Sequence, residues 1–300
     1  MDDLTLFIGY YGRNNIGDDL MLEVLYVEKK HFIFLQDLNT YQFIPKNKQI
    51  ILSKSPIYRT LQKFYYLIYL KFKGVKNTVF GGGTQFSSNS SRYTQLDILF
   101  FVILARALGF KIKAESVGIG SFSSKNKILY IALKLFHNIS VRDLTSSNKL
   151  KSRKIIHTLT SDLVYKLKFN INKVKKPKLT LITATGPVLA MNKSYLKKYL
   201  DFLELNLDRK EEIVFVVFQK GEDEFIFDLL KKKFENINMI IPESRDDLEK
   251  LYNNSKQVIG MRYHSLILAD IFKISFKGFS YDDKVKDLCK KNKMLFTSAL

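Results

Sequence analysis

Apolar and polar positions follow two different periods along this chain. Short runs rich in β-branched and aromatic residues indicate buried strands, and between them apolar residues recur every three to four positions, as in amphipathic helices. This alternation predicts a mostly parallel sheet with helices on its faces. In the first half it predicts strands at Leu4–Gly9, Phe32–Leu35, Gln49–Leu52, Thr78–Phe80, Lys113–Val117, Ile139–Val141 and Thr158–Asp162, and helices at Leu20–Lys29, Tyr58–Phe72, Gln95–Leu108 and Lys127–Phe136.

The alternation is interrupted once, by a lysine- and asparagine-rich stretch at 166–178 that contains Pro177. Such a stretch is typical of a linker between domains. We therefore predict an α/β protein with two Rossmann-like domains, 1–165 and 179–300, that face each other across a cleft. In the second domain the predicted strands are Leu179–Thr183, Ile213–Phe218, Met239–Ile241, Gln257–Met261 and Ile274–Phe279, and the helices are Tyr195–Leu205, Asp223–Phe234, Arg245–Tyr252, Ser265–Phe272 and one that begins at Lys284.

Three residues with useful chemistry follow neighbouring strands of the second domain. Arg262 and His264 come directly after the strand that ends at Met261, and Lys284 follows the next strand. Ligands bind at the carboxyl ends of strands in open α/β sheets, and a helix N-terminus favours anions. Two cations and an imidazole gathered there predict a site for a small, highly charged anion. The alternative is that the Arg-x-His pair has a purely structural role.

The loop after the first strand, 9–19, contains three glycines that allow the backbone to approach a ligand closely. It has neither the G-x-G-x-x-G spacing of dinucleotide sites nor the G-K-S/T ending of a P-loop. Alternatively, Asp18 or Asp19 caps a helix that starts at Leu20.

Two further glycine turns follow strands of the first domain, at Gly81-Gly82-Gly83-Thr84 and at Gly118. Glycines at strand ends indicate close approach, either of a ligand or of a neighbouring loop. The candidate ligand contacts in the glycine-containing loops are Gly9, Tyr11, Asn15, Gly17, Asp18, Gly82, Gly83, Thr84 and Gly118, with Tyr10 and Arg13 as further candidates for an acceptor.

Arg142 ends another strand of the first domain and offers a planar fork for a carboxylate or a phosphate. Its alternative is a surface ion pair with the adjacent Asp143. Of the four histidines only His264 is accompanied by other candidate ligand-binding residues, and His31, His137 and His157 are expected to have packing or surface roles. No pair of histidines has metal-ligand spacing, so we expect no metal site.

Composition narrows the function classes. The one cysteine, Cys289, excludes an internal disulfide, and no stretch is apolar enough for a membrane span or a signal peptide, so we expect a cytoplasmic protein. The net charge of +20 comes from 40 lysines and 9 arginines scattered along the chain without a nucleic-acid motif, so nucleic acid is not the expected partner. In Arg59–Lys76 lysines alternate with aromatic residues, which predicts either peripheral association with the inner face of the membrane or an ordinary helix packed on the sheet.

Taken together, these motifs resemble the polysaccharide pyruvyl transferase family, in the family's order and over nearly the whole chain. The matching segments are Gly9–Asp19, Gly81–Thr84, Gly118–Gly120, Ser140–Asp143, Ser161-Asp162, Gly260–Ser265 and Tyr281–Val285. The resemblance implies a GT-B-like fold and a cytoplasmic enzyme of cell-surface glycan synthesis. Such an enzyme transfers the enolpyruvyl group of phosphoenolpyruvate to a sugar of a polysaccharide or its lipid-linked precursor, forms a pyruvate ketal and releases phosphate.

By the same resemblance, Arg142, Arg262 and Lys284 bind phosphoenolpyruvate and His264 is the catalytic residue. The first domain is then the acceptor side and the second the donor side, with phosphoenolpyruvate as a substrate and no cofactor. We expect domain closure to bring Arg142 to the other three residues.

Two other functions stay open. One is a GT-B glycosyltransferase that uses a nucleotide sugar, with Glu222 as the acidic residue that contacts ribose. The other is a non-catalytic protein that binds anionic glycans or a membrane surface. The sequence departs from the family pattern in continuing only sixteen residues beyond Lys284, so we expect a reduced C-terminal tail.

Overall fold

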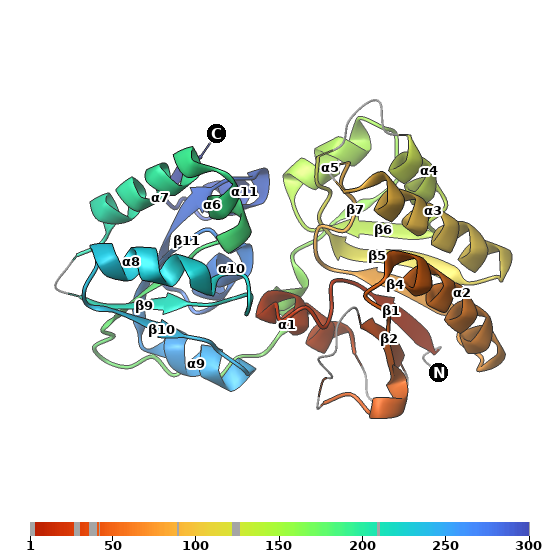
Figure 1. The fold of residues 1–300 in the computed structure, drawn as a ribbon, viewed down its shortest axis with the longest axis horizontal. Helices are drawn as coiled ribbons and strands as arrows, with labels where there is room; N and C mark the ends of the chain where they lie inside the picture. Colours follow the sequence, from red (N-terminus) through yellow and green to blue (C-terminus); the bar gives the residue numbers. More distant parts are fainter. Residues whose placement is uncertain are drawn as a thin grey trace. The chain divides into compact units, whose positions relative to one another are not determined.

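The computed structural model describes residues 4–26, 31–35, 41, 43–88, 90–121, 127–208 and 211–299. The chain forms two compact units (Figure 1). Unit 1 consists of Met1–Arg13 and Met21–Leu163, and unit 2 of Asn14–Leu20 and Val164–Leu300. The predicted linker 166–178 groups with unit 2 because its backbone is hydrogen-bonded there, for example Val174 N to Asn253 O at 3.1 Å.

Unit 1 contains, within the described residues, a seven-stranded parallel sheet in the order β3-β2-β1-β4-β5-β6-β7. The strands are β1 (Thr5–Ile8), β2 (His31–Leu35), β3 (Gln49–Ile51), β4 (Asn77–Gly81), β5 (Lys111–Val117), β6 (Asn138–Val141) and β7 (Thr158–Leu159). The helices that connect them are α1 (Ile16–Leu25), α2 (Pro56–Phe72), α3 (Arg92–Ala107), α4 (Ile128–Lys134) and α5 (Leu144–Lys151), with a single 3-10 turn at Lys46–Lys48. The first half of α1 groups with unit 2, and a further 3-10 turn at Leu163–Lys166 begins at the boundary between the units.

Successive residues of the central strands pack on opposite faces of this sheet, as the period of two requires. Leu6 and Ile8 of β1 contact the core beneath α2, α3 and α4, whereas Phe7 belongs to a second core with Leu22 of α1. Both faces of the sheet are therefore buried at β1, and all residues of β1, β2 and β4 are buried, whereas β5 and β6 alternate between buried and less buried positions.

Unit 2 repeats this architecture. Its sheet, in the part of the chain that the structure describes, has six parallel strands in the order β10-β9-β8-β11-β12-β13. They are β8 (Leu179–Thr183), β9 (Glu212–Val216), β10 (Ile237–Ile240), β11 (Ser255–Gly260), β12 (Ser275–Ser280) and β13 (Phe296–Ser298). The helices are α6 (Gly186–Met191), α7 (Lys193–Asn206), α8 (Phe227–Lys233), α9 (Arg245–Asn253), α10 (Tyr263–Ile271) and α11 (Asp283–Lys291), with a 3-10 turn at Glu224–Ile226.

Each sheet reverses its strand order once, between β1 and β4 in unit 1 and between β8 and β11 in unit 2. At such a switch point the connections leave in opposite directions, and the crevice beyond the carboxyl ends of the two strands is where open α/β sheets bind ligands. The loop at Gly9 and the Gly81–Gly83 turn follow the two strands in unit 1, and Arg262 follows β11 in unit 2.

Four local predictions differ from the structure. Helices α5 and α6 and strand β13 were not predicted, because α5 is polar and the other two are six and three residues long. The first helix begins at Ile16, not Leu20, so Asp18 and Asp19 lie in its first turn and do not cap it. The Oδ1 atom of Asn15 accepts the Gly17 amide at 3.1 Å instead. Residues 27–29 of the helix predicted at Leu20–Lys29 lie outside the described residues.

Candidate functional site

Arg262 is the N-cap residue of α10, immediately after β11 at the switch point of unit 2. Its guanidinium is fixed by three neighbours. Nε and Nη2 donate to the two carboxylate oxygens of Asp223, with Nε–Oδ2 at 3.0 Å, and Nη1 donates to Gln219 Oε1 at 3.1 Å. Nε also lies 3.3 Å from Ala184 O. A bidentate pair of this kind fixes both the position and the plane of the arginine.

Asp223 is the centre of this arrangement. Its side chain has no exposed surface, and besides Arg262 it accepts the backbone amides of Gly186 and Gln219, each at 3.0 Å. Four donors on one buried carboxylate satisfy its charge. Burial, and then the charge of Asp223, raises the pKa of the nearby Tyr199, whose hydroxyl donates to Thr183 O at 3.0 Å.

His264 lies in the first turn of α10 and is 9% exposed. Its ring packs directly on Gly17 in the first turn of α1, where a Cβ atom would overlap the imidazole Nδ1. The segment that carries Gly17 is joined to unit 2 by backbone hydrogen bonds from Ile16 N to Phe218 O and from Lys220 N to Asn14 O, both at 3.0 Å. The structure thus places part of the first glycine loop against the predicted catalytic histidine.

Lys284 lies at the start of α11, after β12. Its ammonium is 2.9 Å from Asp282 Oδ2 and 5.5 Å from the centroid of the Tyr281 ring. The side chain is 24% exposed, more than that of Arg262 at 13%. Lys284 therefore remains accessible to solvent while it is paired.

In unit 1 the glycine turns leave room for protein side chains. A Cβ on Gly9 would lie 2.5 Å from the ring of Tyr11, and one on Gly82 would overlap the Met21 sulfur. The Tyr11 hydroxyl donates to Gly81 O at 2.8 Å. Gly82 and Gly83 have φ values of 60° and 66°, which favour glycine. Close approach of neighbouring segments accounts for these glycines, and their contact with a ligand remains a prediction.

Arg142, at the end of β6, is paired with Asp162 and not with the adjacent Asp143. The Nη1–Oδ2 distance is 2.8 Å, and the two side chains are 3% and 0% exposed. Asp143 instead caps α5 by accepting the Ser146 amide. Nη2 of Arg142 donates to Thr84 Oγ1 at 3.3 Å, and a Cβ on Gly118 would lie 3.2 Å from that nitrogen. Thr84 thus contacts the predicted donor-binding arginine of unit 1, and a side chain in place of Gly118 would crowd it.

The remaining loop candidates have local partners. The guanidinium of Arg13 lies 4.7 Å from the Tyr10 ring centroid, and Asn15 pairs with Gln219 through an isolated bridge. Asp18 is buried, 8% exposed. Among the other histidines, His137 lies beside Arg106, and burial followed by the Arg106 charge lowers its pKa.

Each of the three predicted donor-binding cations has an aspartate partner. Asp162 and Asp223 were missed as functional candidates, because a carboxylate 20 or 39 residues from its arginine gives no local signal. The six side chains together carry no net charge. Because these pairs are neutral overall, an anion would be held by hydrogen bonds from the N–H groups of the cations and attracted by the net positive charge of the whole chain.

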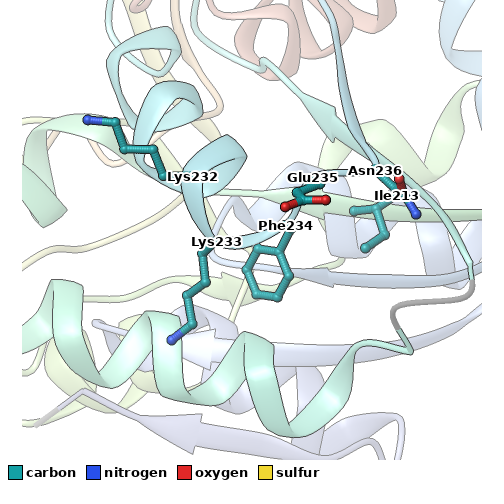
Figure 2. Close-up of a pocket in the computed structure, with 6 residues that line it drawn as sticks. All are labelled: Ile213, Lys232, Lys233, Phe234, Glu235 and Asn236. Atoms are coloured by element: carbon teal, nitrogen blue, oxygen red, sulfur yellow. The ribbon is translucent and has the colours of Figure 1, made fainter.

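A surface pocket occurs elsewhere in unit 2, beside the C-terminal end of α8. It is lined by Ile213, Lys232, Lys233, Phe234, Glu235 and Asn236 (Figure 2). Ile213 is near the amino end of β9, so the pocket lies at the amino ends of the strands, whereas Arg262 follows the carboxyl end of β11. The two lysine amines point away from each other in Figure 2, and Lys233 is 2.9 Å from Glu204. This pocket is therefore not the predicted anion site.

The described residues contain no cluster of three His, Cys, Asp or Glu side chains that could hold a metal ion. None of the helices in the described ranges combines the length and the apolar character that crossing a bilayer would need.

The two-unit fold is similar to several solved structures. UDP-GlcNAc 2-epimerase from Methanocaldococcus jannaschii matches with a TM-score of 0.63 and 14% identity, over 99% of this chain and 89% of that chain. The Neisseria meningitidis UDP-GlcNAc 2-epimerase bound to UDP-GlcNAc has a TM-score of 0.60 and 11% identity, over 100% and 88%. MurG from Acinetobacter baumannii has a TM-score of 0.52 and 11% identity, over 99% and 86%. At these identities the likeness shows the fold alone, and it confirms the predicted GT-B-like class.

Sequence comparison identifies the family. No curated protein sequence matches the chain. The family model described as polysaccharide pyruvyl transferase matches residues 15–283, a range that includes Arg142, Arg262 and His264. Because this range is most of the chain, the protein belongs to the polysaccharide pyruvyl transferase family.

Proposed function

We propose that this protein transfers the enolpyruvyl group of phosphoenolpyruvate to a sugar of a cell-surface polysaccharide or its precursor. The product is a cyclic pyruvate ketal, and phosphate is released. Family membership supports the pyruvyl transfer, and one structural observation supports the donor: an arginine fixed by a buried carboxylate precedes a histidine at a helix start, at the switch point of unit 2.

The chemistry requires a proton, two nucleophiles and a leaving group. A proton adds to the methylene carbon of phosphoenolpyruvate, which becomes the methyl group and leaves an oxocarbenium-like centre at C2. Two sugar hydroxyls form bonds to C2 and lose their protons, and the C2–O bond to phosphate breaks. The donor is a substrate, so the scheme calls for no cofactor.

His264 is the proposed acid and base, because an imidazole can both give and accept a proton near neutral pH. Arg262 is proposed to bind the anionic groups of the donor. A guanidinium has five N–H donors, and the contacts of Arg262 to described residues use Nε, one N–H of Nη1 and one of Nη2. Two N–H groups are left for a carboxylate or phosphate oxygen.

Lys284 and Arg142 are proposed as further donor-binding residues. Their charges would stabilise the departing phosphate, as fixed cations do where negative charge develops. Asp223 and Asp162 are proposed positioning residues, since each holds its arginine in one orientation. The acceptor side is proposed to be unit 1, with contacts from the loop around Tyr11.

A glycosyltransferase that uses a nucleotide sugar is the second candidate, favoured by the solved structure of similar fold with bound UDP-GlcNAc. Glu222, the acidic residue expected for ribose in that case, is exposed and follows Gln219 in the loop after β9. The carboxylate next to it, Asp223, is already occupied by Arg262. The pyruvyl transferase proposal is therefore the stronger.

The test is turnover with phosphoenolpyruvate and a candidate glycan acceptor, with UDP-GlcNAc tried in parallel. The expected product is a glycan whose mass is increased by that of one pyruvic acid minus one water, and one phosphate should be released for each ketal formed. His264→Ala should reduce turnover by about 10²–10⁴-fold, the usual contribution of general acid–base catalysis. His137→Ala, at an exposed histidine, is the control. Full activity of His264→Ala, or consumption of UDP-GlcNAc alone, would contradict the proposal.

A further inference from the structure

Helix α2 has a second apolar face that the fold does not use. Seven large side chains on it are between 42% and 87% exposed: Ile57, Tyr58, Leu61, Tyr65, Ile68, Tyr69 and Phe72. At 3.6 residues per turn they fall within an arc of about 120°. We call these seven residues the outer face of α2.

The opposite side of α2 already supplies its packing. Leu67 and Leu70 are fully buried in the core of unit 1. Towards α3, Lys63 pairs with Asp97 at 2.5 Å, and Thr60 donates to the same carboxylate. In Figure 1, α2 is at the end of the helical layer that runs from α4 through α3. The outer face therefore contributes little to the stability of the unit.

A contiguous group of exposed large apolar side chains, as on the outer face, often marks an interaction site. Three of its members are tyrosines, and the rings of Tyr65 and Tyr69 are stacked with centroids 6.4 Å apart. Tyrosine suits a boundary between apolar and aqueous phases, because its ring is apolar and its hydroxyl is not.

The sequence around the outer face carries charge of one sign. From Lys54 to Lys76 it contains six cations and no aspartate or glutamate, and of these Lys63 lies on the opposite side of α2, paired with Asp97 of α3. Lys71 and Lys73, in the last turn and just after it, are exposed. Lys73 lies 5.5 Å from the Tyr69 ring centroid. Lysines that flank an apolar helix face at its edges are typical of helices that lie in the headgroup region of a membrane.

We propose that the outer face of α2 docks on an anionic lipid bilayer, with α2 lying in the plane of the headgroups. A second copy of this chain would bring an equally positive segment against the first, which like-charge repulsion opposes. An anionic membrane surface complements both the apolar face and its charge. This proposal goes beyond pyruvyl transfer and holds whichever donor the enzyme uses.

The apolar contribution is tested by flotation of the full chain with vesicles of phosphatidylcholine containing phosphatidylglycerol, and with phosphatidylcholine alone. Wild type should bind the anionic vesicles more tightly, and high salt should weaken binding. The test variant is Leu61→Ser/Tyr65→Ser/Phe72→Ser, which should lose at least tenfold in partition coefficient. The control is Ile156→Ser/Met191→Ser/Leu205→Ser, three residues exposed by 94%, 88% and 85% elsewhere, and it should bind as wild type does.

The charge contribution is tested with Lys71→Gln/Lys73→Gln. Each cation removed should weaken binding about fivefold, the change that corresponds to about 1 kcal/mol near an anionic surface. Circular dichroism shows whether each variant is folded, and sedimentation velocity gives its oligomeric state. The proposal is overturned if wild type ignores anionic vesicles or if the outer-face variant binds as tightly as the control. It is equally overturned if that variant only converts a dimer to a monomer.

Discussion

Replacing Asp223 by asparagine removes the one carboxylate that neutralises Arg262. The side chain of Asp223 is fully buried and that of Arg262 is 13% exposed, so water screens little of the interaction. An asparagine amide would also put N–H donors in place of one carboxylate oxygen, and each oxygen of Asp223 now accepts two N–H groups. Breaking a buried pair in this way typically costs about 3–5 kcal/mol. With a urea dependence of about 2 kcal/mol per molar, the midpoint of unit 2 should fall by roughly 1.5–2.5 M.

The measurement is urea unfolding followed by far-ultraviolet circular dichroism, since the chain has no tryptophan. Hydrogen exchange of peptides from β9 and β11 assigns the loss to unit 2. Asp228→Asn, at an exposed position of α8, is the control and should change stability by less than about 0.5 kcal/mol.

A double-mutant cycle separates the pair from the loss of either residue alone. Because Arg262→Met removes the charge that Asp223→Asn leaves unpaired, the double variant should be more stable than the two single losses predict. A loss of less than about 1 kcal/mol in Asp223→Asn would mean that Arg262 is not left as an uncompensated buried charge. Additive losses in the cycle would mean the same.

Three further predictions follow from other contacts. Gly17→Ala should be less stable than wild type because the new methyl group overlaps the His264 ring, even though alanine has a helix propensity about 1 kcal/mol better than glycine. Adding His264→Ala should restore the stability, and a stable Gly17→Ala variant would contradict the contact. Asp162→Asn should destabilise unit 1 by about 3–5 kcal/mol, with partial rescue by Arg142→Met, and no loss of the urea midpoint would contradict the buried pair. Burial raises the pKa of the Cys289 thiol from 9.0 to about 12, so the folded chain keeps a proton that the unfolded chain releases. Stability should then fall above about pH 9, by up to about 1.4 kcal/mol per unit, and Cys289→Ala should unfold with a shallower pH dependence; identical slopes would contradict it.

The strands and long helices were predictable because both faces of each sheet are buried. The largely apolar, buried segments at β1 and β8, and the apolar second half of β11, could be recognised without knowledge of their partners. The polar helix α5 has no apolar period, and its N-cap Asp143 was considered only as an alternative surface partner of Arg142. Its place depends on Leu150, which the tertiary fold buries.

The candidate site was predictable as a set of positions but not as a set of pairs. Strand ends and glycine turns indicate where Arg262 and His264 lie, because parallel strands end at one edge of a sheet. The contact of Gly17 with His264 joins residues far apart in sequence, and the position of Asp223 beneath Arg262 depends on the loop after β9. No local sequence pattern indicates that these pairs of residues are in contact.

Calorimetric titration of the full chain with phosphoenolpyruvate shows whether this compound is the donor. We predict that phosphoenolpyruvate binds at one site per chain and that UDP-GlcNAc does not. Lys284→Gln should weaken that binding at least tenfold, because Lys284 is the most accessible of the three cations. Lys290→Gln, at an exposed position of the same helix, should leave binding unchanged. Binding of UDP-GlcNAc but not of phosphoenolpyruvate, or equal affinities of the two lysine variants for phosphoenolpyruvate, would contradict phosphoenolpyruvate as the donor.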